Sequence, residues 1–347
     1  MAILRVISAI LMAAALTSCY QEFNPTTDIK PVLCINSLIT AGQPVKVEVT
    51  HTWVYNDAPA KNNHSVDDAE VAVYANGVLQ AEDYVAAEGD EIRILASSAS
   101  YGKAEATVIV PHAIPFDMAE ITPTVNYLHK SDSTDNYFSI YISFDLNMAL
   151  KISDRPTTDD YFRIRYYSYI SLPDSDEIMT DPDNPDDYEF YWTEYNDGIA
   201  DYEAEPIFRE HIGVFETVMG NDSGDNMFFS DRQFAGKDYT VTLRFTDCSY
   251  YVRWPKDAME HSEFRDVLFD CGLTINLATM SRSYYDELIY AEAVDYGVIG
   301  DLGNLGFAEP VWGYSNVSTG AGVVAACSYA TYTVNLRDFL EQAFNKH

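Results

Sequence analysis

The sequence predicts a mainly β protein: an N-terminal β-sandwich of immunoglobulin or transthyretin type, followed by a larger antiparallel β domain with two short helices. Two observations favour this class. Short runs of residues alternate between apolar and polar side chains, which is the period of a half-buried strand. The chain of 347 residues also contains 26 Tyr and 17 Phe, and aromatic side chains suit the pleated, half-buried surface of a sheet.

Residues 1–18 are expected to form a lipoprotein signal peptide. Arg5 supplies the positive N-terminal region, and the apolar stretch Ile7–Leu16 is too short for a permanent membrane helix, which needs about 20 residues. Small residues precede Cys19, so we expect cleavage before Cys19, acylation of its thiol and a lipid anchor that ties the domain to a membrane on the far side of the inner membrane, facing the periplasm or the cell surface. A polar tether, residues 19–30, follows and can extend up to about 40 Å.

The charge balance bears on possible partners. The chain has 21 Lys and Arg against 54 Asp and Glu, a formal net charge of −33. Nucleic-acid binding depends on clustered Lys and Arg, so we expect no nucleic-acid partner. The same balance opposes electrostatic adsorption on anionic lipid, so the acyl chains at Cys19 are expected to make the membrane contact.

Residues 31–112 are predicted to form the sandwich, with about seven short strands separated by turns. Asn76-Gly77 suits a two-residue hairpin turn, because both turn positions need a positive φ. Pro111, Pro115 and Pro123 place the expected boundary at His112–Pro123. The alternating segments are Val45–Thr50, Val71–Tyr74, Ile92–Leu95 and Lys103–Val110.

Residues 113–347 are predicted to form the larger β domain. Ser283, with Asp286 three residues later, has the spacing of a capping box and is expected to begin a helix. Asn335 is expected to cap a terminal helix whose apolar stripe packs on the sheet wall. The aromatic and β-branched strands are Tyr137–Phe144, Tyr161–Tyr167, Tyr239–Phe245 and Ala330–Val334, and the stripe is Leu336, Phe339, Leu340, Ala343 and Phe344.

One insertion, residues 174–205, differs in composition from the rest of this domain. It contains 13 acidic residues and no Lys or Arg. A long insertion in a sheet domain is usually functional or disordered, and the aromatic content argues against simple disorder. The segment is therefore predicted to be a contact surface, either for a partner protein or for a cationic ligand, with a solvated, inert loop as the alternative. Its aromatic residues are Tyr188, Phe190, Tyr191, Trp192, Tyr195 and Tyr202.

Within this insertion, a carboxylate-rich run suggests a calcium site, because hard cations take several oxygen ligands from one loop. The candidate metal or partner contacts are Asp181, Asp183, Asp186, Asp187, Tyr191 and Trp192. The run departs from an EF-hand loop, since Asp186 stands at the turn-glycine position and Trp192 at the position of the bidentate glutamate. A solvated acidic loop without metal remains the alternative, and no other cofactor is expected.

Four cysteines follow Cys19. Cys248 ends one predicted strand and Cys271 precedes another, so the two are predicted to form a disulfide at one end of a sheet. Cys34 and Cys327 lie within apolar strands, where a second bridge and two buried thiols are both open.

No catalytic signature is present. The seven histidines show no His-Glu-x-x-His pattern and no metal spacing with cysteine. With 54 acidic residues, no pair of carboxylates can be singled out for hydrolysis. We therefore expect a protein that is not an enzyme.

A series of short motifs follows Cys19 in order along the mature chain. These are Pro31–Ile39, Val66–Gly77, Phe229–Asp231, Gly236–Thr240, Ile275–Leu277, Ser281, Tyr284-Tyr285, Phe307–Pro310, Tyr314–Asn316 and Gly320–Gly322. In these motifs the chain resembles the Bacteroidetes lipoproteins of domain-of-unknown-function family 4249. The resemblance covers nearly the whole mature chain, but departs from the family pattern around Thr319–Gly322 and in the terminal helix.

The resemblance implies a location at the outer membrane beside TonB-dependent receptors, with no established activity or functional residue. It leads to the hypothesis of a non-enzymatic accessory lipoprotein that docks on such a receptor and helps to capture a small-molecule or oligomeric nutrient. The alternatives are a surface adhesion or structural lipoprotein with an acidic calcium-binding loop and, third, a hydrolase.

Overall fold

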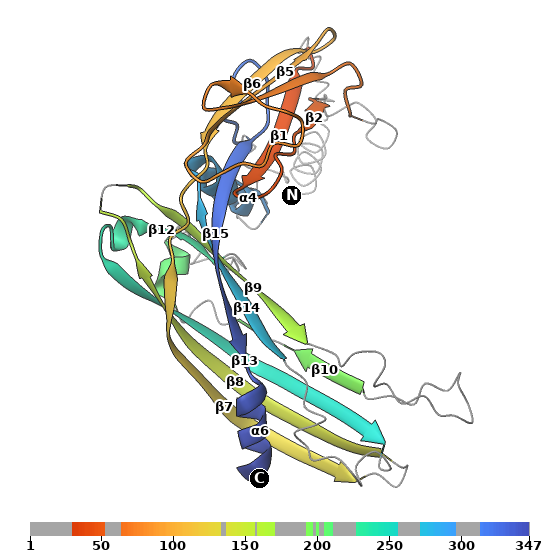
Figure 1. The fold of residues 1–347 in the computed structure, drawn as a ribbon, viewed down its shortest axis with the longest axis vertical. Coiled ribbons are helices and arrows are strands. Elements are labelled where there is room, and N and C mark those ends of the chain that lie inside the picture. The colour runs from red at the N-terminus through yellow and green to blue at the C-terminus, as the bar shows by residue number, and fades with distance from the viewer. Residues whose placement is uncertain are drawn as a thin grey trace, which may run out of the picture.

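The computed structural model describes residues 30–52, 64–132, 137–156, 158–170, 192–196, 199–200, 205–210, 227–255, 271–295 and 313–346. In this part of the chain the fold is mainly β, with several antiparallel sheets and two α-helices, as the sequence predicts. The strands form two lobes, a shorter one built around the N-terminal strands and a longer one built from the later strands (Figure 1).

The N-terminal lobe is a β-sandwich. One layer is the sheet β4-β3-β5-β6, and the other consists of β2, β1 and the first part of β15. Apolar side chains from both layers meet in a core that includes Ile35, Ile94 and Val324. The strand bounds are Leu33–Thr40 (β1), Glu48–His51 (β2), Glu70–Ala75 (β3), Val78–Leu79 (β4), Glu91–Ser98 (β5), Gly102–Ile109 (β6) and Val324–Asn335 (β15).

The predicted Asn76-Gly77 turn is confirmed. It joins β3 to β4, and both residues have a positive φ, 51° for Asn76 and 79° for Gly77. Asn76 also donates a side-chain hydrogen bond to Asp90 (2.8 Å), which fixes the turn against the start of β5.

The longer lobe also has two layers. One is β10-β13-β8-β7, with β11 beside β13, and the other is β12-β9-β14 with the rest of β15. Between them lies the largest apolar core, which includes Phe144, Phe245 and Ile275. The bounds are Phe116–Asp132 (β7), Tyr137–Ser153 (β8), Tyr161–Ile170 (β9), Trp192–Asn196 (β10), Ile199–Ala200 (β11), Phe228–Ser230 (β12), Asp238–Pro255 (β13) and Cys271–Met280 (β14).

Strand β15 joins the two lobes. Residues 324–327 pair in parallel with β1, and residues 327–335 pair antiparallel with β14. One six-stranded sheet therefore runs through both lobes, and the C-terminal part of the chain completes the N-terminal sandwich. Before β15, Gly322 lies so close to β1 that an added Cβ would stand 2.1 Å from the carbonyl oxygen of Ile35, so only glycine fits there.

The region around the expected boundary differs from the prediction. Pro123 lies inside β7 instead of ending a linker, and pairs with Leu146 of β8. The strand tolerates it because β7 is an edge strand, where a missing backbone donor removes no sheet bond on the open side.

The two predicted helices are present. The helix α4 (Arg282–Asp295) is capped by Ser281 and not by Ser283, since the Ser281 hydroxyl accepts from the amide of Tyr284 (3.3 Å) and the Ser283 hydroxyl donates to the Val324 carbonyl. The helix α6 (Arg337–Lys346) begins as predicted, with the Asn335 side chain accepting from the amide of Arg337 (2.8 Å). Its buried Leu340 packs into the core of the longer lobe.

Candidate functional site

The predicted lipid-attachment residue, Cys19, lies outside the described residues. Most of the residues predicted to bind metal or a partner also lie outside them: Asp181, Asp183, Asp186, Asp187 and Tyr191. The exception is Trp192, whose backbone begins β10 and pairs with Arg253 of β13. Residues 192–196 and 199–200 of the acidic insertion are therefore strands on the β13 edge. This part of the insertion therefore extends the sheet, and its predicted role as a contact surface stays a prediction.

Glu205, the last acidic residue of the insertion, has a structural role. Its side chain is 4% exposed and caps a short 3₁₀ helix, η3 (Pro206–Arg209). Its carboxylate accepts hydrogen bonds from the Tyr239 hydroxyl (2.8 Å) and from the Thr242 amide (2.7 Å). The insertion is thus fastened to β13 at this residue.

The cysteines lie differently from the predicted arrangement. Cys248 lies within β13, not at its end, because a bulge between Phe245 and Cys248, with Asp247 at a φ of 58°, lets the strand continue. Cys271 begins β14 in the other sheet, and both cysteines are buried in the same core. A bridge between them stays a prediction, and it would join the two layers.

Cys34 and Cys327 cannot pair with each other in this fold. Cys327 lies opposite Thr40 in the ladder between β1 and β15, and Cys34 lies six residues from Thr40. At about 3.3 Å per residue, this places the two cysteines about 20 Å apart, far beyond the reach of a disulfide.

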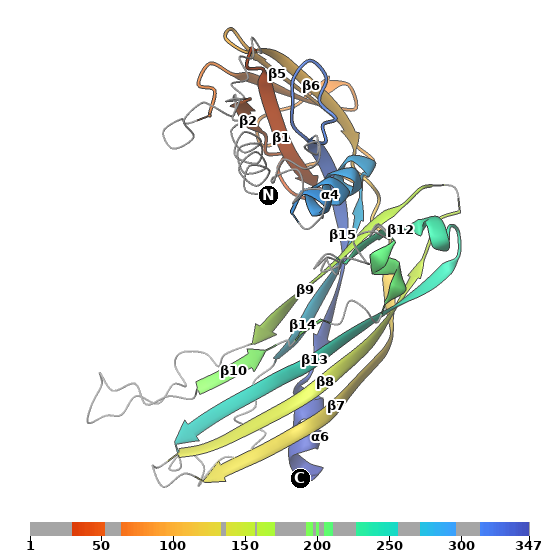
Figure 2. The same ribbon diagram turned by 180° about the vertical axis from the view of Figure 1, so that it is seen from behind.

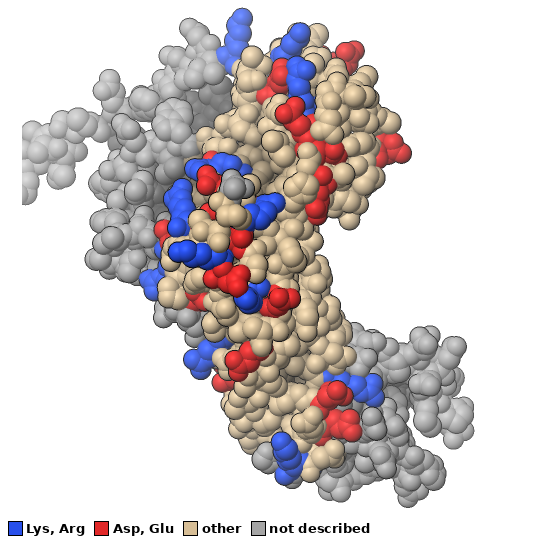
Figure 3. Space-filling model, turned by 60° about the vertical axis from the view of Figure 1, so that its left-hand side comes forward, with Lys and Arg blue, Asp and Glu red and all other residues tan. Residues whose placement is uncertain are grey.

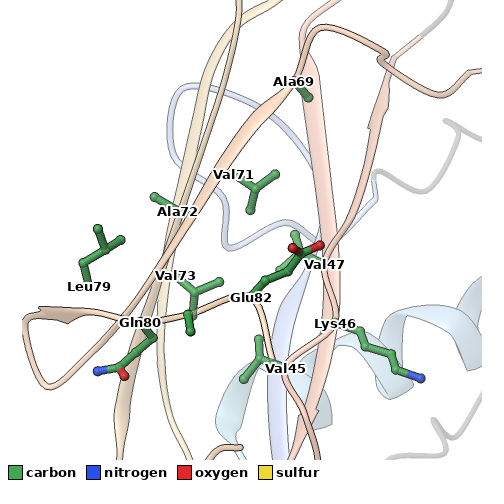
Figure 4. Close-up of a pocket in the computed structure, with 11 residues that line it drawn as sticks. Val45, Lys46, Val47, Ala69, Val71, Ala72, Val73, Leu79, Gln80 and Glu82 are labelled. Atoms are coloured by element: carbon green, nitrogen blue, oxygen red, sulfur yellow. The ribbon is translucent and has the colours of Figure 1, made fainter. Parts of the chain in front are cut away.

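A groove of about 770 Å³, lined mainly by aliphatic residues, opens on the side of the N-terminal lobe. One wall is the segment Val45–Val47 that leads into β2, and the other is β3 with the start of the chain after β4 (Figure 4). Of the described residues that line it, only Lys46 and Glu82 carry charge. The full lining is Val45, Lys46, Val47, Ala69, Val71, Ala72, Val73, Leu79, Gln80, Ala81 and Glu82.

The groove exists because one layer of the sandwich is wider than the other. Val71 pairs with the buried Ala96 and therefore faces the core side of its sheet, yet 43% of its surface is exposed. Leu79 is 61% exposed. Figure 4 shows Val47, Val71 and Val73 directed toward the space between the walls. The interior of the sandwich is thus open to solvent at this edge.

The backbone at this edge is also open. The amide of Gln80 donates to the Val73 carbonyl (2.9 Å), and backbone groups alternate in direction along a strand. The N–H and C=O of Val71 therefore point the same way, past the end of β4, and no described strand pairs with them. The opposite wall is fixed, because the Val45 amide donates to the Tyr84 carbonyl and the Ser37 hydroxyl to the Lys46 carbonyl.

The chain enters the N-terminal lobe at its far tip. Leu33, at the start of β1, bonds to Tyr101 in the turn between β5 and β6, whereas Ala41, after the end of β1, bonds to Cys327, where β15 passes into the longer lobe. The described chain therefore begins at the end of the N-terminal lobe that lies away from the longer lobe, where β1 starts (Figure 1). No helix in the described part of the chain is long and apolar enough to cross a membrane.

A second candidate is a cluster of three carboxylates at the corner of the longer lobe, formed by Asp154, Asp160 and Asp231. One oxygen of each lies within 4.8 Å of the others. Asp154 follows β8, Asp160 precedes β9, and Asp231 begins η4 (Asp231–Gln233) after β12. Figure 3 shows basic and acidic side chains intermingled near the middle of the molecule.

Burial shapes the electrostatics of this cluster. Asp160 and Asp231 are buried, and burial raises the pKa of both Asp231 and Asp154, with further increases from neighbouring carboxylates. Arg155 binds both oxygens of Asp160. Backbone amides of Gly236 and Asp160 donate to Asp154 (2.7 Å) and Asp231 (3.0 Å) respectively. These bonds tie three chain segments together, so each carboxylate already has a structural role and we assign no cation to the cluster.

Neither the groove nor the carboxylate cluster was predicted from the sequence. Val71 belongs to a regular alternating strand, and nothing local indicates that the opposite layer stops short of it. The three aspartates are 77 residues apart at their extremes, and the pairings of β9 with β12 and of β8 with β13 bring them together.

Comparison with models of known protein families identifies the family of this chain. The model of a family described as "Domain of unknown function (DUF4249)" matches residues 20–333. The chain belongs to this family. The match to DUF4249 begins one residue after Cys19 and covers both lobes. No curated protein and no solved structure matches the chain.

Proposed function

We propose that this DUF4249 protein is a non-enzymatic lipoprotein of the outer membrane, anchored through Cys19. It acts as an accessory to a TonB-dependent transporter, docking on the barrel and helping to capture its ligand. The observation that carries the proposal is the groove on the lobe that the tether enters. Its lining offers surface for association and contains only one cation and one carboxylate.

The geometry supports docking close to the membrane. A tether of residues 19–30 reaches at most about 40 Å, so an anchored N-terminal lobe stays close to the lipid while the longer lobe extends away from its attachment point. The groove combines exposed valine and leucine side chains with an open strand edge. This combination suits an added strand, because main-chain bonds supply affinity and alternate side chains fill the apolar space.

The test is co-purification from the native outer membrane. The tagged full chain should bring down a TonB-dependent barrel, identified by mass spectrometry. Val71→Asp, which puts a charge into the groove, should abolish this. Ile109→Asp is the matched control, since Ile109 is 60% exposed on β6 and does not line the groove.

Both variants should unfold at the same temperature as the wild type, because neither position is buried. Retention of the barrel by a folded Val71→Asp variant would refute docking through the groove. The alternative, an adhesion or structural lipoprotein with calcium bound in the acidic segment, predicts attachment that calcium chelation removes and no barrel in the purified material.

A further inference from the structure

The outer face of the six-stranded sheet carries a second surface, in the longer lobe. The register aligns Arg165, Asn276 and Thr331 in one row across β9, β14 and β15. The neighbouring rows contain Arg163 with Tyr329, and Tyr167 with Thr274. Alternate residues such as Ile164 and Ile275 belong to the buried core, so these side chains are on the opposite face. We call this the arginine–tyrosine face, consisting of Arg163, Arg165, Tyr167, Asn276, Tyr329 and Thr331.

The helix α4 bounds this face at one end. It lies against β15 and β9 where the two lobes meet (Figure 2). Tyr284 of this helix packs with Tyr161 and Met280 of the sheet in a separate buried cluster. The guanidinium of Arg163 donates to the Tyr284 hydroxyl (3.0 Å), so Arg163 is held at the foot of the helix. The uncovered part of the sheet begins at this row.

The exposed groups on this face are aromatic rings and hydrogen-bond donors. Tyr167 is 52% exposed and Tyr329 36% exposed. Arg165 lies between them, with the tyrosines 167, 284 and 329 as ionisable neighbours. Thr331 donates to the amide oxygen of Asn276 (2.7 Å), which leaves the Asn276 N–H groups as donors.

The charge of this face contrasts with the rest of the molecule. The chain carries 54 acidic residues, yet the six described residues that define the face include two arginines and no carboxylate. Repulsion of an anion by distant carboxylates is screened beyond about 8 Å at physiological ionic strength, so the local arginines dominate at contact. A bound carboxylate can form a bidentate pair with a guanidinium.

We propose that the arginine–tyrosine face binds an acidic saccharide, with sugar rings on Tyr167 and Tyr329 and a sugar carboxylate on Arg165. The two tyrosines are two strands and four residues apart, a diagonal of about 16 Å, which suits an extended oligomer. The amphipathic tyrosine ring offers both an apolar surface and a hydroxyl.

This inference rests on the ligand-capture part of the proposed function and is independent of docking. The test uses the full chain in detergent and titration calorimetry with oligogalacturonate. Its methyl ester, the same sugar without charge, is the matched probe. We expect binding of the acid at least tenfold tighter than binding of the ester.

Arg165→Gln should weaken binding of the acid by about 10- to 100-fold, the usual range for a lost charge-assisted hydrogen bond. The control Arg93→Gln removes an equal charge from the other lobe, where Arg93 pairs with Glu105, and should leave binding unchanged. Tyr167→Ala should also weaken binding, while Tyr127→Ala, a comparably exposed tyrosine on β7, should not.

No binding of oligogalacturonate, equal binding of acid and ester, or unchanged binding in a folded Arg165→Gln variant would each overturn the proposal. Equal affinity for poly-glutamate would also overturn it, because the face would then be a general anion site. Arg165→Gln should still co-purify with the barrel, so failure of saccharide binding and failure of docking are separate results.

Discussion

Replacing Glu205 tests whether the acidic insertion is fastened to the sheet as the structure indicates. Glu205→Ala removes the acceptor for the Tyr239 hydroxyl and the Thr242 amide. A buried donor left without an acceptor costs about 1–3 kcal/mol. Because Tyr239 and Thr242 are themselves only partly shielded from water, we expect the low end for each and a total loss of about 2–3 kcal/mol.

Glu205→Gln separates charge from shape. The amide keeps one acceptor oxygen but presents a donor where the other carboxylate oxygen stood, so we expect an intermediate loss of stability. Burial, and to a smaller extent the hydrogen bond with Glu205, raises the pKa of Tyr239 to about 12. Removing the charge should lower this pKa, which should stay above 10 because burial is the larger cause.

The assays are urea unfolding for stability and phenolate absorbance for the Tyr239 pKa, measured as a difference against Tyr239→Phe to remove the other tyrosines. The folded state holds the Tyr239 proton more tightly than the unfolded state does. This group therefore lowers the stability of the folded protein as pH rises from about 10 through 12. Glu105→Ala, which breaks an exposed pair with Arg93, is the control and should change stability little. An unchanged urea midpoint in Glu205→Ala, or an unchanged Tyr239 pKa in Glu205→Gln, would refute this reasoning.

Four further outcomes are expected. Cys19→Ala should release the protein from membranes, and a variant that still fractionates wholly with the outer membrane would show another anchor. Non-reducing peptide mapping should find Cys248 joined to Cys271, and two unmodified thiols would contradict the bridge. Asp154→Asn should stabilise the protein at neutral pH, since the pKa of Asp154 is raised, and this advantage should shrink as pH falls through that pKa in urea titrations against the wild type. Deleting residues 174–190, which spares β10 and Glu205, should weaken partner binding and reduce its salt dependence; unchanged affinity in the folded variant would make the segment inert.

The strands were predictable from sequence because their signal is local. Alternation identified β5 and β6, aromatic and β-branched content identified the first halves of β8 and β13, and the need for two positive φ values identified the turn at Asn76-Gly77. Strand ends were missed where sheet context overrides local rules. Pro123 is tolerated because β7 is an edge strand, and β13 passes Cys248 because a bulge absorbs the extra residue.

The candidate surfaces could not be predicted, because each depends on pairing between distant segments. The exposure of Val71 follows from the short β4 and from a facing layer in which β2 is the last described strand. The row of Arg165, Asn276 and Thr331 exists only because β14 pairs with β9 on one side and β15 on the other. In sequence, these three residues belong to ordinary half-exposed strand positions.

The strong negative charge of the chain affects which molecules can approach its two candidate surfaces, the groove and the arginine–tyrosine face. An open sandwich edge with exposed valines is a hazard, because unpaired strands recruit other copies of the chain. A net charge of −33 opposes such contacts between copies, since each approaching molecule carries the same field. The groove lining holds one carboxylate and the arginine–tyrosine face none, so a partner or ligand that fits either surface meets little local repulsion there. The acidic composition thus raises the barrier to unspecific contacts while leaving these two surfaces available for specific ones.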